Sequence, residues 1–182
     1  MRAPDTDELT TRLARVRLLL LDVDGVLTDG AIVYSAAGDE LKAFHVRDGV
    51  ALRLWQEAGN CVGIVTGRSS HPVSRRAKEL GIAHVLQGVG DKVPAAEEIL
   101  GRAGVGWDET ASIGDDLPDL PVAHRAAVSF AVADACAELR AAATLVTTLP
   151  GGRGAVREAV ERLLGARGGW DTAVARYRGG VA

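Results

Sequence analysis

The sequence has few cysteines, and neither of them suggests a redox or zinc site. Only Cys61 and Cys136 occur in 182 residues, and both lie in apolar segments, where a thiol usually serves as a small buried hydrophobic side chain. A disulfide framework needs several cysteines, and a zinc site needs cysteine and histidine ligands at short spacing. Neither pattern occurs, so we expect no disulfide framework and no zinc centre.

The chain also lacks long apolar runs and an excess of positive charge. None of its apolar segments approaches the roughly 20 residues that cross a bilayer, and residues 1–11 are polar, unlike a signal peptide. The 21 basic and 24 acidic side chains give a net charge of −3, which does not favour nucleic acid or an anionic membrane as a partner. We therefore predict a cytoplasmic protein with neither partner.

Apolar strands alternate with amphipathic helices from residue 16 onward, and 47% of the residues are hydrophobic. This alternation is typical of an α/β fold with a doubly wound, Rossmann-like parallel sheet. The length suits one domain, which we place over residues 1–182, with its core at about 16–164. The glycine- and arginine-rich tail, residues 165–182, shows no strong pattern.

The first predicted strand carries the strongest functional signal. Four leucines, residues 18–21, run directly into Asp22, Asp24 and Gly25. A continuous apolar run indicates a strand buried on both faces, and ligands of such sheets collect beyond the carboxyl ends of the strands. Two carboxylates there suit a hard cation and a phosphate, although a strand that merely ends in an acidic turn would look the same.

Three later segments complete a recognisable order. Residues 62–68 form an apolar strand that ends in threonine, glycine and arginine, Lys92 precedes a helical pattern, and residues 111–119 run into an acidic cluster. The order acid pair, threonine, lysine, acid cluster resembles the haloacid dehalogenase-like phosphohydrolases, whose motifs are DxD, T/S, K and GDDxxD. The resemblance implies the haloacid dehalogenase-like form of the doubly wound sheet.

A narrower resemblance rests on longer segments. They read DVDGVLTDG at 22–30, LKAFHVRDG at 41–49, TGR at 66–68, QGVGDK at 87–92 and GGRGAVRE at 151–158. Together they are similar to the 3-deoxy-D-manno-octulosonate 8-phosphate phosphatases, which are small, nearly capless, tetrameric members of the superfamily. The resemblance implies a homotetramer in which a β-hairpin, here residues 31–34 and 40–45, replaces a cap domain. It also suggests a subunit contact for residues 151–154.

The resemblance assigns the reaction to named residues. Asp22 would attack phosphorus to form an aspartyl phosphate, and Asp24 would protonate the departing oxygen and later deprotonate water. Thr66 and Gly67 would donate hydrogen bonds to the phosphoryl oxygens, and Lys92 would hold the phosphate near the nucleophile. A lysine at a helix start is electrostatically unfavourable, which favours a functional role over a merely exposed one.

The same resemblance predicts the cofactor as Mg²⁺. Its protein ligands would be Asp22, the backbone carbonyl of Asp24, and Asp115, with waters and substrate phosphate completing the shell. Asp116 and Asp119 would orient waters or Lys92. Carboxylates brought this close repel one another unless a cation lies between them.

The implied substrate is a small sugar-acid phosphate, so a second anion must be recognised. Arginine pairs with a carboxylate through two hydrogen bonds, which makes Arg47, Arg68 and Arg76 candidates, although Arg76 could equally be a solvated helix residue. By resemblance the stretch 45–49 contacts substrate, which adds His45, Asp48 and Gly49. Asp48 would also cap a helix that extends to about residue 58.

The function implied by the resemblance is Mg²⁺-dependent hydrolysis of 3-deoxy-D-manno-octulosonate 8-phosphate, a phosphoric monoester hydrolase reaction. Two alternatives remain at this point. The same chemistry could serve another acidic sugar phosphate, such as a nonulosonate 9-phosphate or a specialised-metabolite sugar phosphate. The chain could instead be a catalytically silent scaffold of a sugar-nucleotide pathway, but the intact Asp22, Asp24, Thr66, Lys92 and Asp115 argue against silence.

Overall fold

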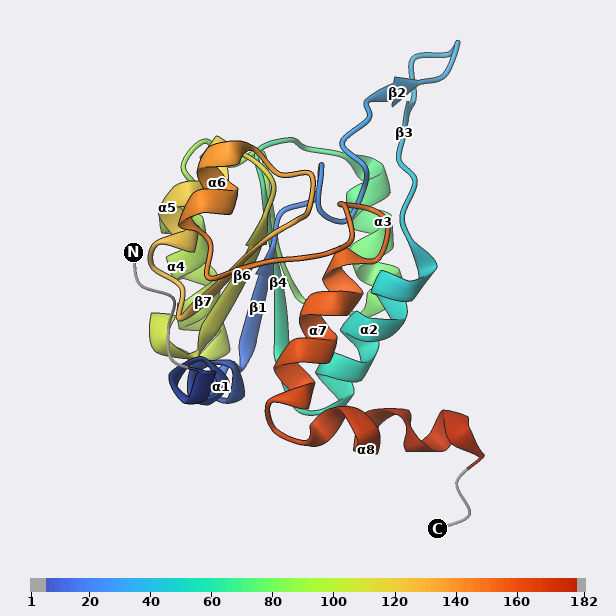
Figure 1. Ribbon diagram of the computed structural model, residues 1–182. Coiled ribbons are helices and arrows are strands. Elements are labelled where there is room, and N and C mark those ends of the chain that lie inside the picture. Colours follow the sequence, from blue (N-terminus) through green and yellow to red (C-terminus); the bar gives the residue numbers. More distant parts are fainter. Residues whose placement is uncertain (1–5, 180–182) are drawn as a thin grey trace.

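A six-stranded parallel sheet forms the centre of the computed structural model, which describes residues 6–179 (Figure 1). Across the sheet the strands are β5 (His84–Gln87), β4 (Cys61–Thr66), β1 (Leu18–Leu21), β6 (Thr110–Gly114), β7 (Val128–Ala131) and β8 (Leu145–Val146). Strand β1 lies between β4 and β6, with Leu20 opposite Gly63 and Ser112. The predicted doubly wound parallel sheet is therefore confirmed.

Helices cover both faces of this sheet (Figure 1). They are α1 (Thr6–Arg15), α2 (Val46–Glu57), α3 (His71–Leu80), α4 (Lys92–Ala103), α5 (Leu120–Ala123), α6 (Ala137–Ala142), α7 (Ala155–Gly165) and α8 (Gly169–Ala175). Short 3₁₀ turns η1 (Trp107–Glu109), η2 (Leu117–Asp119) and η3 (Arg176–Arg178) complete the chain. None of the helices within residues 6–179 has the length and apolar character needed to cross a bilayer.

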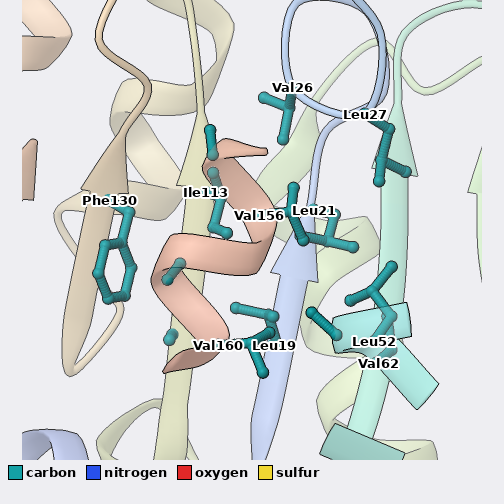
Figure 2. Close-up of a cluster of buried hydrophobic side chains, with 14 of the residues drawn as sticks. Leu19, Leu21, Val26, Leu27, Leu52, Val62, Ile113, Phe130, Val156 and Val160 are labelled. Atoms are coloured by element: carbon teal, nitrogen blue, oxygen red, sulfur yellow. The ribbon is translucent and has the colours of Figure 1, made fainter. Parts of the chain in front are cut away.

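The four leucines of β1 explain how the two faces are filled. Leu19 and Leu21 join a core with residues of α2, α3 and α7, whereas Leu18 and Leu20 pack with α4. Successive side chains on a strand point to opposite faces, so an uninterrupted leucine run suits a central strand covered on both sides. Figure 2 shows the larger core, where Val156 of α7 lies over the sheet near Leu21 and Ile113.

A hairpin projects from the end of the sheet where β1 finishes (Figure 1). Its strands β2 (Val33–Tyr34) and β3 (Glu40–Leu41) pair antiparallel, Val33 with Leu41 and Tyr34 with Glu40. The predicted hairpin is present but its paired segments are shorter, because only two residues of each arm form the ladder. No cap domain is present in residues 6–179.

Three details differ from the sequence-based expectations. Helix α2 begins at Val46 with His45 as its cap, so Asp48 does not cap it. Residues 6–15 form α1, which the polar composition did not predict, and its Leu13 joins the core. The unpatterned tail forms α8, whose Trp170 packs against the core of its own chain.

Candidate active site

The carboxyl ends of β1, β4 and β6 meet at a cavity of about 410 Å³. Asp22 directly follows β1, Thr66 ends β4, and Asp115 directly follows β6, while Lys92 begins α4. The chain reaches this edge at each point because parallel strands end on the same side of the sheet. The cavity is lined by Asp22, Asp24, Gly30, Thr66, Gly67, Arg68, Val89, Gly90, Lys92, Asp115, Asp116, Pro118 and Asp119.

Lys92 is held between two carboxylates. Its Nζ lies 3.0 Å from Asp22 Oδ1 and 2.7 Å from Asp119 Oδ1, and its side chain is 7% exposed. Burial alone would lower the pKa of Lys92, but the charges of Asp22 and Asp119 outweigh burial and raise it. The lysine is therefore a fixed positive charge beside the Asp22 carboxylate.

Asp119 fixes the loop that carries Asp115. Its Oδ2 accepts hydrogen bonds from the backbone N–H groups of Asp115 and Asp116, at 3.0 and 3.3 Å. The loop approaches so closely that a Cβ on Gly114 would lie 2.5 Å from Asp119 Cβ. Because both oxygens of Asp119 already have partners, this residue supports the site and leaves Asp22 and Asp115 facing the cavity.

The carboxylates form a set that suits a cation. Asp22, Asp115 and Asp119 each offer an oxygen, and these atoms lie within 4.8 Å of one another. Burial, with the charges of Asp22 and Asp119, raises the pKa of Asp115 to about 7, and burial is also the main cause of a raised pKa at Asp22. A hard cation with oxygen preference, such as Mg²⁺, relieves this repulsion, so the residues present fit the group.

Asp24 lies beside two cations, one from the hairpin and one from the loop that follows β4. Lys42 donates to Asp24 Oδ1, and Arg68 Nε lies 3.6 Å from Asp24 Oδ2. Glu40 of β3 bridges the two cations, because its Oε1 lies 2.8 Å from Arg68 Nη2 and 3.4 Å from Lys42 Nζ. Sequence analysis missed Lys42 and Glu40. Their spacing of two residues on a strand predicted beside the site, which places both on one face, was the available signal.

The other predicted substrate contacts lie outside the cavity. Arg76 stacks over the Phe44 ring at 5.9 Å, and a Cβ on Gly49 would lie 2.3 Å from Arg76 Nη2. Arg76 lines a neighbouring cavity of about 330 Å³ that Glu40 and Lys42 also line. Arg47 lines a third, with Arg157 and Glu158 of α7.

Asp48 is buried, and its carboxylate accepts a hydrogen bond from the first turn of α7. Its Oδ1 accepts the backbone N–H of Arg157 at 2.8 Å, and its Oδ2 lies 3.9 Å from His45 Nδ1. Burial raises the pKa of Asp48. The structure thus joins Asp22, Asp24, Thr66, Gly67, Arg68, Lys92 and Asp115 around one cavity. It leaves His45, Arg47, Asp48, Gly49 and Arg76 apart from that cavity within this chain.

The glycine-rich segment before α7, residues 151–154, packs against the loop that follows β1, residues 22–30. A Cβ on Gly151 would lie 1.7 Å from the carbonyl oxygen of Gly25, and one on Gly152 would lie 2.4 Å from the carbonyl carbon of Thr28. The Gly152 N–H also donates to the Val26 carbonyl at 2.9 Å. Within this chain, these glycines allow the two segments to touch backbone to backbone.

Comparison with known proteins identifies relatives over nearly the whole chain. A family model described as haloacid dehalogenase-like hydrolase matches residues 82–157. The 3-deoxy-D-manno-octulosonate 8-phosphate phosphatase of Salmonella typhi is 44% identical over 170 residues, covering 93% of this chain and 90% of that protein.

Solved structures of phosphatases with the same name are similar to this chain in fold as well as in sequence. The corresponding phosphatase of Moraxella catarrhalis, crystallised with magnesium ion, phosphate ion and KDO, superposes with a TM-score of 0.92 at 41% identity, covering 95% of this chain and 99% of that one. The Yersinia pestis phosphatase superposes with a TM-score of 0.89 at 43% identity, covering 92% and 91%. Likeness of this extent, in sequence and in fold, places the chain in the 3-deoxy-D-manno-octulosonate 8-phosphate phosphatase family of haloacid dehalogenase-like hydrolases.

Proposed function

We propose that this chain is a Mg²⁺-dependent phosphatase that hydrolyses 3-deoxy-D-manno-octulosonate 8-phosphate to the free sugar acid and phosphate. The observation that carries the proposal is the Asp22 carboxylate at the sheet edge, 3.0 Å from the Lys92 ammonium and grouped with Asp115. A carboxylate held in this way can act as a nucleophile toward phosphorus. The relatives named for this reaction, one of them crystallised with magnesium and KDO, support the substrate and the cofactor.

In the first step an Asp22 oxygen attacks phosphorus, and the bond from phosphorus to the sugar oxygen breaks. Lys92 neutralises charge on the phosphoryl group, and the Thr66 hydroxyl and Gly67 N–H hold its other oxygens. Asp24 gives a proton to the departing sugar oxygen. Bound Mg²⁺, with Asp22, the Asp24 carbonyl and Asp115 as its protein ligands, supplies positive charge at the transferring phosphoryl group.

In the second step water hydrolyses the aspartyl phosphate. Asp24, which has lost its proton to the sugar oxygen, accepts one from the water, so that the two steps return it to its starting state. Asp119 keeps Lys92 and the Asp115 loop in place through both steps, because its two oxygens are bound to them. The phosphate then leaves, and Asp22 is free for another cycle.

Recognition of the sugar carboxylate is assigned to arginine. Arg68 lines the cavity and its side chain is 41% exposed, so it remains accessible to an anion. Arg76 and the stretch His45–Gly49 lie farther out, where they would contact the distal part of the substrate or a site formed with a second copy.

We propose that the enzyme is a homotetramer. The hairpin is too small to cover the cavity, yet it exposes several apolar side chains, Ile32, Val33, Tyr34 and Leu41. Exposed apolar groups gathered on one projection favour burial against another copy in a closed, symmetric assembly. The tail beyond residue 164 would reach a neighbouring site. Sedimentation, with and without the tail, tests this assembly.

We further propose that the whole chain acts as one domain, in the cytoplasm. A sugar phosphate carries charges that do not cross an apolar bilayer unaided, so it is consumed in the compartment where it is made.

A panel of sugar phosphates tests the proposed activity. Phosphate release would be measured with Mg²⁺ for 3-deoxy-D-manno-octulosonate 8-phosphate, for a nonulosonate 9-phosphate and for a neutral sugar phosphate. The proposal predicts the highest kcat/KM for the first. A higher kcat/KM for either of the others would reassign the substrate, and no release from any of them would contradict the activity.

A further inference from the structure

The side chain of Lys42, at the foot of the hairpin, is nearly fully buried. Only 1% of it is exposed, and its ammonium contacts Asp24 and Glu40. A lysine is rarely buried unless its charge is paired, because removal of an ammonium from water is costly. The burial of this side chain therefore indicates a specific contact within the fold and not an incidental ion pair at the surface.

The contact belongs to a closed ring of alternating charge. Lys42 lies between Asp24 and Glu40, and Arg68 lies between the same two carboxylates on the other side. Each oxygen of Asp24 thus faces one cation, Oδ1 facing Lys42 and Oδ2 facing Arg68. Of these two contacts only that of Lys42 is a hydrogen bond, because Arg68 Nε lies 3.6 Å from Oδ2 and has no hydrogen-bond partner among the residues that the structure describes. Lys42 therefore holds the carboxylate through Oδ1 and leaves Oδ2 available to carry the proton.

The two buried lysines of the site serve different carboxylates. Lys92 contacts Asp22 and Asp119, whereas Lys42 contacts Asp24 and Glu40. Lys92 also lines the main cavity, where phosphate would bind, whereas Lys42 lines the adjacent cavity with Arg76. Lys42 is therefore placed to act on Asp24 and not on the phosphate.

We propose that Lys42 is a positioning residue that orients the Asp24 carboxylate toward the leaving-group oxygen, so that the hairpin contributes directly to the chemical step. The inference rests on the proposed function of Asp24 as the group that protonates this oxygen. A proton donor must lie within hydrogen-bond reach of its acceptor, and small misplacements of catalytic groups lower rates by factors of about 100. A residue that fixes Asp24 therefore controls kcat.

The test compares Lys42→Met with Lys42→Arg, which keeps the cation. Lys42→Met should lower kcat for the sugar phosphate by about 10- to 100-fold, in line with loss of positioned acid catalysis, with little change in KM. The loss should be smaller with 4-nitrophenyl phosphate, whose phenolate leaves without protonation. Lys42→Arg should recover part of kcat. The matched control is Lys78→Met, at an exposed lysine in the last turn of α3, which should behave as the wild type.

A double variant separates positioning from other roles. In Asp24→Asn the orientation of the side chain no longer matters, so adding Lys42→Met should cause no further loss of kcat. Binding of Mg²⁺ and of inorganic phosphate, measured by calorimetry, should be unchanged in Lys42→Met. Equal losses on both esters, additive losses in the double variant, or weakened Mg²⁺ binding would each overturn the proposal.

Two further measurements keep the test decisive. Thermal unfolding of each variant checks that it folds, and Lys42→Gln replaces Lys42→Met if the latter does not. A wrong substrate can be told apart from a wrong role for Lys42. If the substrate is wrong, the wild type is inactive on 3-deoxy-D-manno-octulosonate 8-phosphate, and the variants are compared on another alkyl phosphate that the wild type hydrolyses. Wild-type rates in Lys42→Met on an alkyl phosphate would refute the positioning role alone.

Discussion

A Cβ on Gly25 would lie 2.0 Å from Asp115 Oδ2, so the proposed metal ligand occupies the space that any other residue at position 25 would fill. Gly25 also has a φ of +87°, a region that other residues rarely adopt. The glycine of the DxDG segment thus has two reasons to be there, the turn after β1 and the approach of Asp115.

The change Gly25→Ala should therefore displace Asp115 as well as strain the turn. We expect Mg²⁺ affinity and kcat to fall at least about 10-fold, because a displaced ligand binds the metal less well. Calorimetry with Mg²⁺ and phosphate-release assays measure both. Gly38→Ala is the matched control, since Gly38 has a φ of +89° but open space around it. Equal effects of the two changes would show that backbone strain alone is responsible.

The raised pKa of Asp115 predicts how stability depends on pH and Mg²⁺. With a pKa of about 7 in the folded, metal-free chain and about 4 when unfolded, the folded state binds the extra proton between these values. Metal-free stability should then fall as pH rises from about 4 to 7. Mg²⁺ binds the ionised form, so it should raise Tm more at pH 8 than at pH 5.

Thermal unfolding in EDTA and in Mg²⁺ at the two pH values measures this effect. Asp115→Asn should raise the metal-free Tm at pH 8 relative to the wild type and abolish the response to Mg²⁺. Asp108→Asn, at an exposed position in η1, is the control and should leave both unchanged. A wild-type response to Mg²⁺ that is the same at both pH values would count against the role given to Asp115.

Gly151→Ala tests the close contact between the glycine-rich segment and the loop that follows β1. The added methyl would collide with the Gly25 carbonyl, and backbone cannot rotate aside as a side chain does. We expect a loss of about 1–3 kcal/mol in the free energy of unfolding, measured with urea, together with reduced kcat. Gly101→Ala in α4, which meets no atom within 4 Å, should be neutral or stabilising. An active, fully stable Gly151→Ala enzyme would show that this contact does not require glycine at position 151.

Asp48 distinguishes a structural role from substrate binding. Because its carboxylate accepts the Arg157 N–H in the first turn of α7, Asp48→Ala should cost about 0.5–2 kcal/mol of stability, as loss of a helix cap does. The KM of this variant should change little if the main role of Asp48 is to cap α7. A raised KM with unchanged stability would support the substrate contact that the sequence predicted.

The sequence-based predictions succeeded where the pattern is local. Leucines 18–21 followed by Asp22 predicted both the buried strand and the place of its acids, and the structure has β1 and Asp22 there. The role of Asp48 was harder to predict, because its partner is distant in the chain. Asp48 contacts Arg157, 109 residues away, and no local pattern encodes such a pairing. Helix α8 was missed for a similar reason, since Trp170 packs through tertiary contacts.

The most direct test of the account is phosphate release by Asp22→Asn. An amide is a poor nucleophile but nearly the same size as the carboxylate, so the variant should fold and still bind the substrate with Mg²⁺. We predict that wild-type enzyme releases phosphate from 3-deoxy-D-manno-octulosonate 8-phosphate only when Mg²⁺ is present, and that the rate with Asp22→Asn is below about one thousandth of that. Turnover by Asp22→Asn above this level would contradict covalent catalysis at Asp22.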